Sequence, residues 1–283
     1  VDAGSKDVSL ASTGAIVMSS IQADKVGLKA VSGISVISSG VTEFAAESDG
    51  GDISITNTGG YAISDHSSTS GITGVRFTDP GATGTITLIA NSPLTIDAPV
   101  DAGKGVMQLT AAGSTSTDDV TVNAALSGGA IAVSAGDSIA VTAGGLTATN
   151  LALTANTDIS LNAPVTSTSA DLKAGNQISL DSGAKVSSTN FSITSTKLSV
   201  DPSSTVPAFK FSGGAAGDPS FDRNGRVQEA TQRDWNDYFR ASETIELAYD
   251  SAGDVVLDQL VVSLISNDAN PVNTGEVELE EEE

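Results

Sequence analysis

The chain has 283 residues, no cysteine, one histidine, and 35 acidic against 13 basic side chains, for a formal net charge of -22. Phosphate backbones and anionic lipid headgroups repel so acidic a chain, and no apolar run is long enough to span a bilayer, so we expect neither nucleic-acid binding nor membrane insertion. Without cysteine there is no disulfide, thiolate metal site or thiol nucleophile, and one imidazole supplies no histidine pair. The chain starts at Val1 without a basic, apolar leader, so we expect a processed mature form or an excised piece.

The first third of the chain contains short apolar pairs separated by one residue and bounded by glycine, serine and aspartate. This alternation is typical of half-buried β-strands. The segment 64–74 is polar and longer than the other spacers, so we expect a looped-out corner there, with His66 solvated. The predicted strand cores are Val8–Leu10, Val26–Leu28, Ile34–Val36, Ile53–Ile55, Val75–Phe77 and Ile86–Leu88.

The middle of the chain repeats one pattern three times per period. A first apolar pair recurs at intervals of 26, 19, 20, 19 and 20 residues, at Leu94–Ile96, Val120–Val122, Ile139–Val141, Ile159–Leu161, Ile178–Leu180 and Leu198–Val200. A second pair follows in most periods, at Ile131–Val133, Leu151–Leu153, Phe191–Ile193 and Phe209–Phe211. A single apolar residue lies between the two pairs, at Val100, Leu126, Leu146, Val165, Val186 and Val206.

A unit this short cannot close a core alone, but stacked copies bury all of their inward faces. The sequence therefore predicts an all-β fold, a parallel β-solenoid of nine or ten coils over residues 1–211. Ile139, Ile159 and Ile178 should stack at the roughly 4.8 Å spacing of neighbouring strands, which gives a rod on the order of 45 Å long. Small residues such as Gly128–Gly129, Gly144–Gly145 and Ala163–Pro164 are predicted to permit the bends.

The repeat pattern ends after Phe211. Residues 212–283 hold 17 acidic and 4 basic side chains, a net charge of -13, which leaves -9 on residues 1–211. We predict a separate C-terminal capping or assembly segment. It comprises a short helix opened by a capping box at Thr231–Asp234, a hairpin of 244–249 with Val255–Ile265, and a solvated acidic tail at 276–283.

Several segments of the rod carry a family resemblance. They are NSPLTIDAPV at 91–100, VMQLTAAGSTSTDDVTVNAAL at 106–126, GGDISITNTGG at 50–60 and TDISLNAPV at 157–165. These segments resemble the repeats of filamentous haemagglutinin-like bacterial surface and secreted exoproteins, over roughly residues 1–211. The resemblance implies a right-handed parallel β-helix, export across a Gram-negative envelope, and roles in adhesion, biofilm or fibre formation.

Aspartates precede or begin several predicted strands. At such positions a carboxylate accepts hydrogen bonds from the N–H groups of the turn, which is the interpretation that we favour. The alternative is Ca²⁺ held between coils by stacked carboxylates and carbonyl oxygens, with Asp49, Asp52, Asp118 and Asp119 as the candidate ligands. The G-G-x-G-x-D repeat of calcium-loaded β-rolls is absent, so no cofactor is predicted and Ca²⁺ is the open alternative.

Two other functions suit the same architecture. In a carbohydrate-cleaving or carbohydrate-binding β-helix, Asp97 and Asp101 would be the carboxylates placed near each other for glycoside hydrolysis. The predicted rod offers one arginine, one tyrosine and no tryptophan to line a groove, so we predict no enzyme activity. Rows of outward threonine can order water and bind ice, but Thr147–Thr149 and Thr166–Thr168 are isolated T-x-T pairs.

The C-terminal segment has two interpretations, because a solenoid end exposes unpaired backbone. Residues 221–265 fold back as a cap on the last coil, or the apolar stretch at 255–265 pairs with a neighbouring subunit, so that head-to-tail contacts repeat into a filament. The residues predicted to carry this assembly are Val255, Val256, Leu257, Leu260, Val261, Val262, Leu264, Ile265, Trp235 and Phe239.

These expectations combine into one functional hypothesis. The chain is predicted to be an extracellular structural β-solenoid, either a subunit of a self-assembling cell-surface fibre or matrix or the shaft of an adhesin. It would be secreted or lie on the surface of a Gram-negative bacterium. Its expected partners are other copies of itself, head to tail, and cell-surface glycans or proteins.

Overall fold

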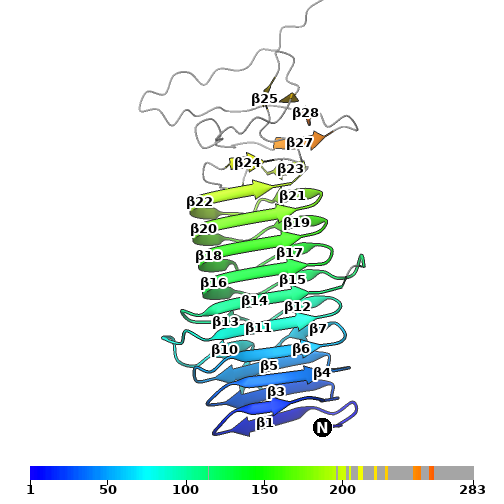
Figure 1. Cartoon of the computed structure of the whole chain (residues 1–283), viewed down its shortest axis with the longest axis vertical. Helices are drawn as coiled ribbons and strands as arrows, with labels where there is room; N and C mark the ends of the chain where they lie inside the picture. The colour runs from blue at the N-terminus through cyan, green and yellow to red at the C-terminus, as the bar shows by residue number, and fades with distance from the viewer. Residues whose placement is uncertain are drawn as a thin grey trace, which may run out of the picture.

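The computed structural model describes residues 1–113, 115–195, 197–201, 204, 210–212, 220–221, 227–228, 245–249 and 255–257. These residues form a parallel β-solenoid of about nine turns and contain no helix. In Figure 1 the strands nearest the viewer run from left to right as the chain climbs from the N-terminus, so the solenoid is right-handed. The all-β fold, the parallel stacking and the coil length of about 20 residues are confirmed.

From the third coil onward, each coil passes through three faces in a fixed order, whereas the first two coils have strands on the first and second faces only. The third face consists of β7 (Tyr61–Ile63), β12 (Leu94–Ile96), β15 (Val120–Val122), β17 (Ile139–Val141), β19 (Asp158–Leu161), β21 (Gln177–Leu180) and β23 (Lys197–Val200). The first face consists of β1 (Val8–Ser12), β3 (Lys25–Ala30), β5 (Glu43–Ser48), β10 (Val75–Phe77), β13 (Val100–Asp101) and the first halves of β16 (Leu126–Ala135), β18 (Leu146–Ala155), β20 (Val165–Ala174) and β22 (Val186–Thr194).

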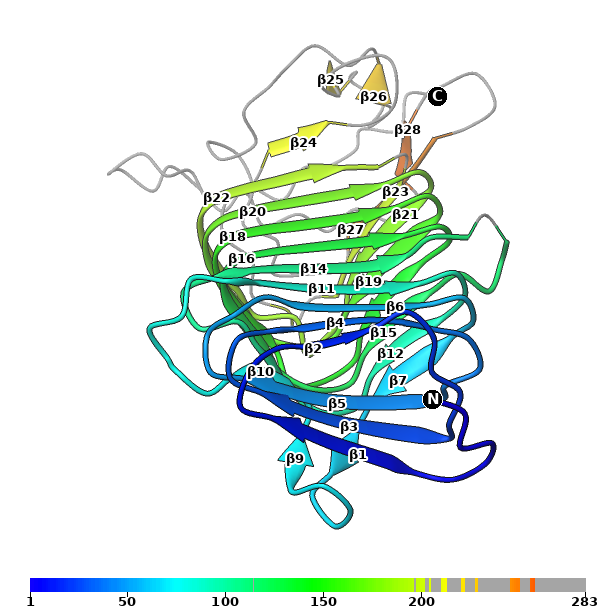
Figure 2. The same cartoon turned by 60° about the horizontal axis from the view of Figure 1, so that its bottom comes forward.

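The second face is the broadest of the three. It begins with β2 (Ile16–Met18), β4 (Ile34–Ser38), β6 (Ile53–Asn57), β11 (Thr85–Ala90) and β14 (Val106–Ala111). It continues through the second halves of β16, β18, β20 and β22 to β24 (Lys210–Ser212). Figure 2 shows these strands as one continuous wall of the coil.

The core is a set of apolar ladders in which each inward residue stacks on its equivalent in the next coil. Ile139 pairs with Ile159 and Ile159 with Ile178, as the repeat spacing predicts. The single apolar residues also form one ladder from Val100 through Leu126, Leu146 and Val165 to Val186, while Val206 lies outside the described residues. Stacking in this register buries these side chains almost completely.

One outward threonine pattern differs from its prediction. The T-x-T pairs predicted to be isolated lie on adjacent coils, because Thr147 is opposite Thr166, which is opposite Ser187. This contact is not evident in the sequence, because a whole coil separates the two pairs along the chain.

The corner after the second face changes its chemistry along the rod. In the N-terminal coils it holds the buried Asn57, whose side-chain amide accepts a hydrogen bond from Ser38 Oγ at 2.8 Å and donates to backbone carbonyls of Val41 at 3.1 Å and Gly59 at 3.2 Å. Asn57 therefore closes a corner that the backbone leaves unsatisfied. In later coils an alanine ladder takes over, at Ala90, Ala111, Ala135, Ala155 and Ala174.

The predicted glycine corner at Gly144–Gly145 is confirmed by backbone geometry. Both residues have positive φ, 78° and 83°, and a Cβ on Gly144 would lie 2.2 Å from the carbonyl carbon of Ala124 in the coil below. Only glycine fits a left-handed bend with another backbone so close.

The described C-terminal strands close part of the last coil. β27 (Ile245–Tyr249) pairs antiparallel with β23, and β28 (Val255–Leu257) pairs antiparallel with β27. These strands fall within the segments predicted to form a hairpin, 244–249 and 255–265, and their antiparallel direction ends the parallel stack on the third face. β28 also bridges β26 (Val227–Gln228), which pairs with β25 (Ser220–Phe221). The predicted helix at Thr231–Asp234 and the acidic tail lie outside the described residues.

The stacking of inward isoleucines predicts how a substitution in the core changes the free energy of unfolding. Ile159→Ala removes a side chain that is 1% exposed between Ile139 and Ile178, so unfolding in urea should become easier by about 2–5 kcal/mol. Thr154→Ala, an exposed change on β18, should alter the free energy of unfolding by no more than about 0.5 kcal/mol. Equal effects of the two substitutions would contradict the assigned register.

Candidate functional site

The densest group of charged side chains lies on the outer surface of the first face, in the N-terminal coils. Glu47 on β5 sits in register between Lys29 on β3 and Arg76 on β10. Lys29 Nζ lies 3.0 Å from Glu47 Oε2, and Arg76 donates from Nε to Glu47 Oε1 at 2.9 Å and also from Nη2. The two cations cover the carboxylate so well that its side chain is only 3% exposed.

The surroundings of Glu47 pull its pKa in two directions. Burial raises the pKa of the carboxyl, but the hydrogen bonds from Lys29 and Arg76 and their positive charges outweigh burial, so the pKa lies below its ordinary value. Glu47 is therefore a fixed anion between two cations, and it ties three successive coils together.

A second carboxylate, Glu43, lies at the start of β5. It pairs with Lys25 Nζ at 2.9 Å and accepts a hydrogen bond from Ser64 Oγ at 2.6 Å. His66 Nε2 lies 2.8 Å from Ser64 Oγ and 3.4 Å from Glu43 Oε2. Burial raises the pKa of Glu43, but the hydrogen bonds from Ser64 and Lys25 outweigh this effect and lower it.

His66 belongs to the predicted looped-out corner, where β8 (Asp65–His66) and β9 (Ile72–Thr73) form a small antiparallel hairpin. The prediction that His66 is solvated is wrong, since it is 3% exposed. Figure 2 shows β9 on the outside of the coil, and the hairpin lies over β3 and β5. It covers Gly27, whose lack of a side chain leaves room for Ser70 and the buried Ile72.

The single proton of the Ser64 hydroxyl decides how this cluster is hydrogen-bonded. The Ser64 hydroxyl has one proton and donates it to Glu43, so His66 Nε2 must be the donor in its contact with Ser64 Oγ. A nucleophilic serine needs the reverse arrangement, in which histidine accepts the serine proton. In this geometry the three side chains fasten the hairpin to the coils beneath it.

Sequence inspection overlooked this cluster, although a signal was present. Lys25 precedes Glu43 by 18 residues, and Lys29 precedes Glu47 by the same interval. That interval is one coil in this part of the rod, so opposite charges repeated at the coil length predict ion pairs between adjacent strands.

The four aspartates considered as calcium ligands accept hydrogen bonds from the chain itself. Asp52 Oδ1 accepts from the Thr85 N–H at 2.7 Å, Asp119 Oδ1 from the Ser138 N–H at 3.0 Å, and Asp49 Oδ1 from Thr78 Oγ1 at 2.6 Å. The fourth, Asp118, is buried and accepts at Oδ2 from Thr115 Oγ1 at 2.8 Å. Within the described ranges, no three acidic or histidine side chains gather closely enough to hold a metal ion.

Two of these bonds refine the turn interpretation. Asp52 and Asp119 serve N–H groups of the following coil, 33 and 19 residues away, and not their own turn. Asp158 does the same, accepting from the Gln177 N–H at 3.0 Å.

The carboxylates of the carbohydrate alternative are also bound between coils. Asp97 Oδ1 accepts from Asn123 Nδ2 at 2.7 Å, and Asn123 Oδ1 in turn accepts from Thr142 Oγ1 at 2.5 Å. Asp101 Oδ1 accepts from the Gly103 N–H at 2.9 Å and from Ser127 Oγ at 2.8 Å. These side chains form polar ladders along the corners of the rod.

Three of the ten predicted assembly residues can be placed. Val255, Val256 and Leu257 form β28, where they pair with β27 of the same chain. The other seven lie outside the described residues: Leu260, Val261, Val262, Leu264, Ile265, Trp235 and Phe239.

Comparison of the chain with family models, curated proteins and solved structures finds no match. No described residue belongs to a helix of the length and apolarity needed to cross a membrane.

Removing the charge of Glu47 should weaken the contacts among the three coils that contain β3, β5 and β10. Glu47→Gln keeps the shape of the side chain but replaces the carboxylate between Lys29 and Arg76 with an uncharged amide. The free energy of unfolding should therefore fall by roughly 1–2 kcal/mol at neutral pH. Because the folded pKa of Glu47 is lowered, the stabilisation is present above the ordinary pKa of glutamate and is lost as the pH falls through the folded value. Urea unfolding at several pH values should therefore show the two curves converging in acid.

Asp79→Asn is the control for Glu47→Gln, since it removes the same charge from an exposed turn. Equal losses in the two variants, or a gap that persists in acid, would contradict the assigned ion pairs.

The hairpin should depend on the absence of a side chain at Gly27. A Cβ there would lie 2.5 Å from Ser70 Oγ and 2.6 Å from Ser70 Cβ, so Gly27→Ala should displace the hairpin and speed cleavage within 64–74 by proteinase K. Gly14→Ala is the matched control, because its Cβ would meet nothing closer than 3.8 Å. Unchanged cleavage of the Gly27 variant would refute the packing of the hairpin on β3.

Proposed function

We propose that this chain is an extracellular structural β-solenoid, the shaft of an adhesin or the subunit of a self-assembling cell-surface fibre or matrix of a Gram-negative bacterium. One observation carries the proposal: the carboxylates that are candidates for metal binding or catalysis are engaged in hydrogen bonds that hold corners and coils together. Side chains used in this way stiffen a rod. The resemblance of the repeats to filamentous haemagglutinin-like exoproteins supports the same proposal.

End-to-end association is part of the proposal. Among the described residues, β1 pairs only with β3 and β2 only with β4, so each has one backbone edge without a strand partner. Val8 and Leu10, whose side chains point along the core, are half-buried at this end. A second copy placed head to tail would supply these strands with a partner.

Electron microscopy and sedimentation velocity of the purified full chain test this proposal. We expect rods longer than one molecule, on the order of 45 Å, to accumulate as the concentration rises. Leu10→Asp should abolish this growth, because it places a carboxylate on the apolar end of the stack. Ser9→Asp, an outward change on the same strand, should leave it intact.

Two kinds of result would contradict this proposal. Single rods of the unmodified chain at every concentration, or equal growth of the two variants with unchanged circular dichroism, would overturn head-to-tail assembly. Cleavage of a polysaccharide, measured as release of reducing sugar, would overturn the structural role in favour of the carbohydrate alternative.

A further inference from the structure

The outward side of the second face is uncharged over most of the rod, although the chain carries a net charge of -22. From β2 to β18 its outward positions hold serine, threonine, alanine, valine, isoleucine, asparagine and glutamine. The middle column, for example, runs through Ser54, Thr87, Gln108, Ala132 and Ala152 in direct register.

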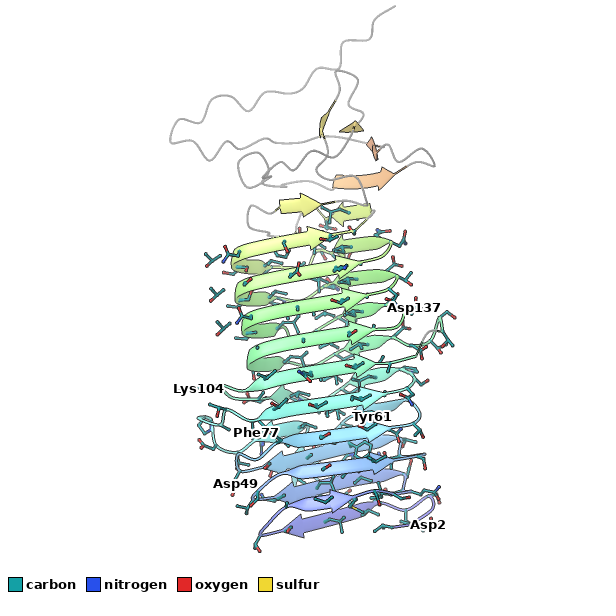
Figure 3. All side chains as sticks on the ribbon, in the orientation of Figure 1. Asp2, Asp49, Tyr61, Phe77, Lys104 and Asp137 are labelled. Atoms are coloured by element: carbon teal, nitrogen blue, oxygen red, sulfur yellow. The ribbon has the colours of Figure 1, made fainter. Side chains whose placement is uncertain are left out.

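This face also carries three of the five large apolar side chains that are exposed in the described residues. They are Val17 at 77%, Ile37 at 53% and Val106 at 37% exposed. Figure 3, with this face toward the viewer, shows Asp49, Lys104 and Asp137 at the two edges of the rod. The charged side chains therefore lie mainly at the corners and on the first face, and few of them lie on the second face.

Two charges interrupt this face between β2 and β22, and both lie on β20. Asp171 continues the middle column after Ala152, and Lys173 continues the neighbouring column after Thr154. Both side chains are exposed. Asp171 accepts a hydrogen bond from Ser192 on β22. The charges are opposite in sign and stand one column apart at the same height on the rod.

We propose that two copies of this chain pack side by side through their second faces, with the rods parallel and a twofold axis along the rod direction between the middle and neighbouring columns. Such an axis places the middle column of one copy opposite the neighbouring column of the other copy, at the same height along the rod. Asp171 then faces Lys173 of the second copy, and Lys173 faces its Asp171. All remaining contacts between β2 and β18 are between uncharged side chains.

The charge distribution selects a second copy as the occupant. Two molecules with a charge of -22 repel each other through their acidic corners, and the second face is the broad surface on which that repulsion is smallest. Between β2 and β22 the face holds one positive and one negative charge, so this part complements itself; Lys210 continues the middle column on β24, above Ser192. This pairing is lateral and goes beyond the proposed function, because a shaft or an end-to-end fibre forms without it.

The area suffices for a stable contact. The face has nine strands spaced by roughly 4.8 Å; β2 has three residues and the others have five or six on this face, so at about 3.3 Å per residue the area is roughly 750 Å². Two such faces bury about 1,500 Å² in total, which is the size of a standard specific interface.

Sedimentation velocity of the full chain over a concentration series tests the pairing. We expect a monomer–dimer equilibrium for the unmodified protein. Gln108→Glu places two carboxylates inside the contact and should raise the dimer Kd at least tenfold. Gln22→Glu makes the same chemical change at an exposed position outside the second face and should leave Kd unchanged.

A charge exchange tests the parallel arrangement. Asp171→Lys alone places two lysines opposite each other and should weaken the dimer, whereas Asp171→Lys with Lys173→Asp restores opposite pairs and should recover most of the affinity. Both variants lose the bond from Ser192, so that loss cancels in the comparison.

Three results would overturn the inference. The first is a monomer at every concentration, the second is equal shifts in Gln108→Glu and Gln22→Glu, and the third is a double exchange as weak as the single one. Assembly that is abolished by Leu10→Asp and unaffected by Gln108→Glu is end-to-end. The two variants therefore distinguish failure of the lateral pairing from failure of the proposed end-to-end assembly.

Discussion

The structure depends on the stacking of each coil on an equivalent coil in register. One coil of about 20 residues has three short strands and no partner for its inward side chains, so it has no core of its own. In the stack, Ile159 is covered by Ile139 below and Ile178 above, and the same backbone ladder satisfies the N–H and C=O groups of the strands that lie between two others. Burial and hydrogen bonding therefore share one register, and a shift of one residue would lose both.

Stacking also creates an electrostatic problem for an acidic chain, since identical residues would lie roughly 4.8 Å apart along each corner. The corners solve it by alternation. In one corner Asp97 is followed by Asn123 and Thr142, and in another Asp119 is followed by Ser138 before Asp158 recurs. In these two corners the carboxylates are thus kept at least about two rungs apart, near the screening length of physiological salt, and the neutral residues between them donate hydrogen bonds.

The three faces consequently offer different surfaces to a partner. The first face is cross-linked by Lys29, Glu47 and Arg76 and partly covered by the β8–β9 hairpin. The third face is narrow, with aspartates such as Asp97 and Asp119 at its edges. The second face is broad and mostly uncharged. The same separation that makes the rod stable as a stack leaves one surface on which another rod can lie.

The sequence alone determined the fold, the period and the inward ladders, because alternation and a repeat near 20 residues leave few other ways to bury Ile139, Ile159 and Ile178. Tertiary structure decided which outward residues meet. Coil lengths vary, and the insertion at 64–74 breaks the count, so the sequence does not show that His66 is buried beside Glu43, that Thr147 stacks on Thr166, or that the second face is uncharged. Inward positions can be recognised in the sequence by their hydrophobicity, whereas the neighbours of an outward residue are defined only by the register between coils.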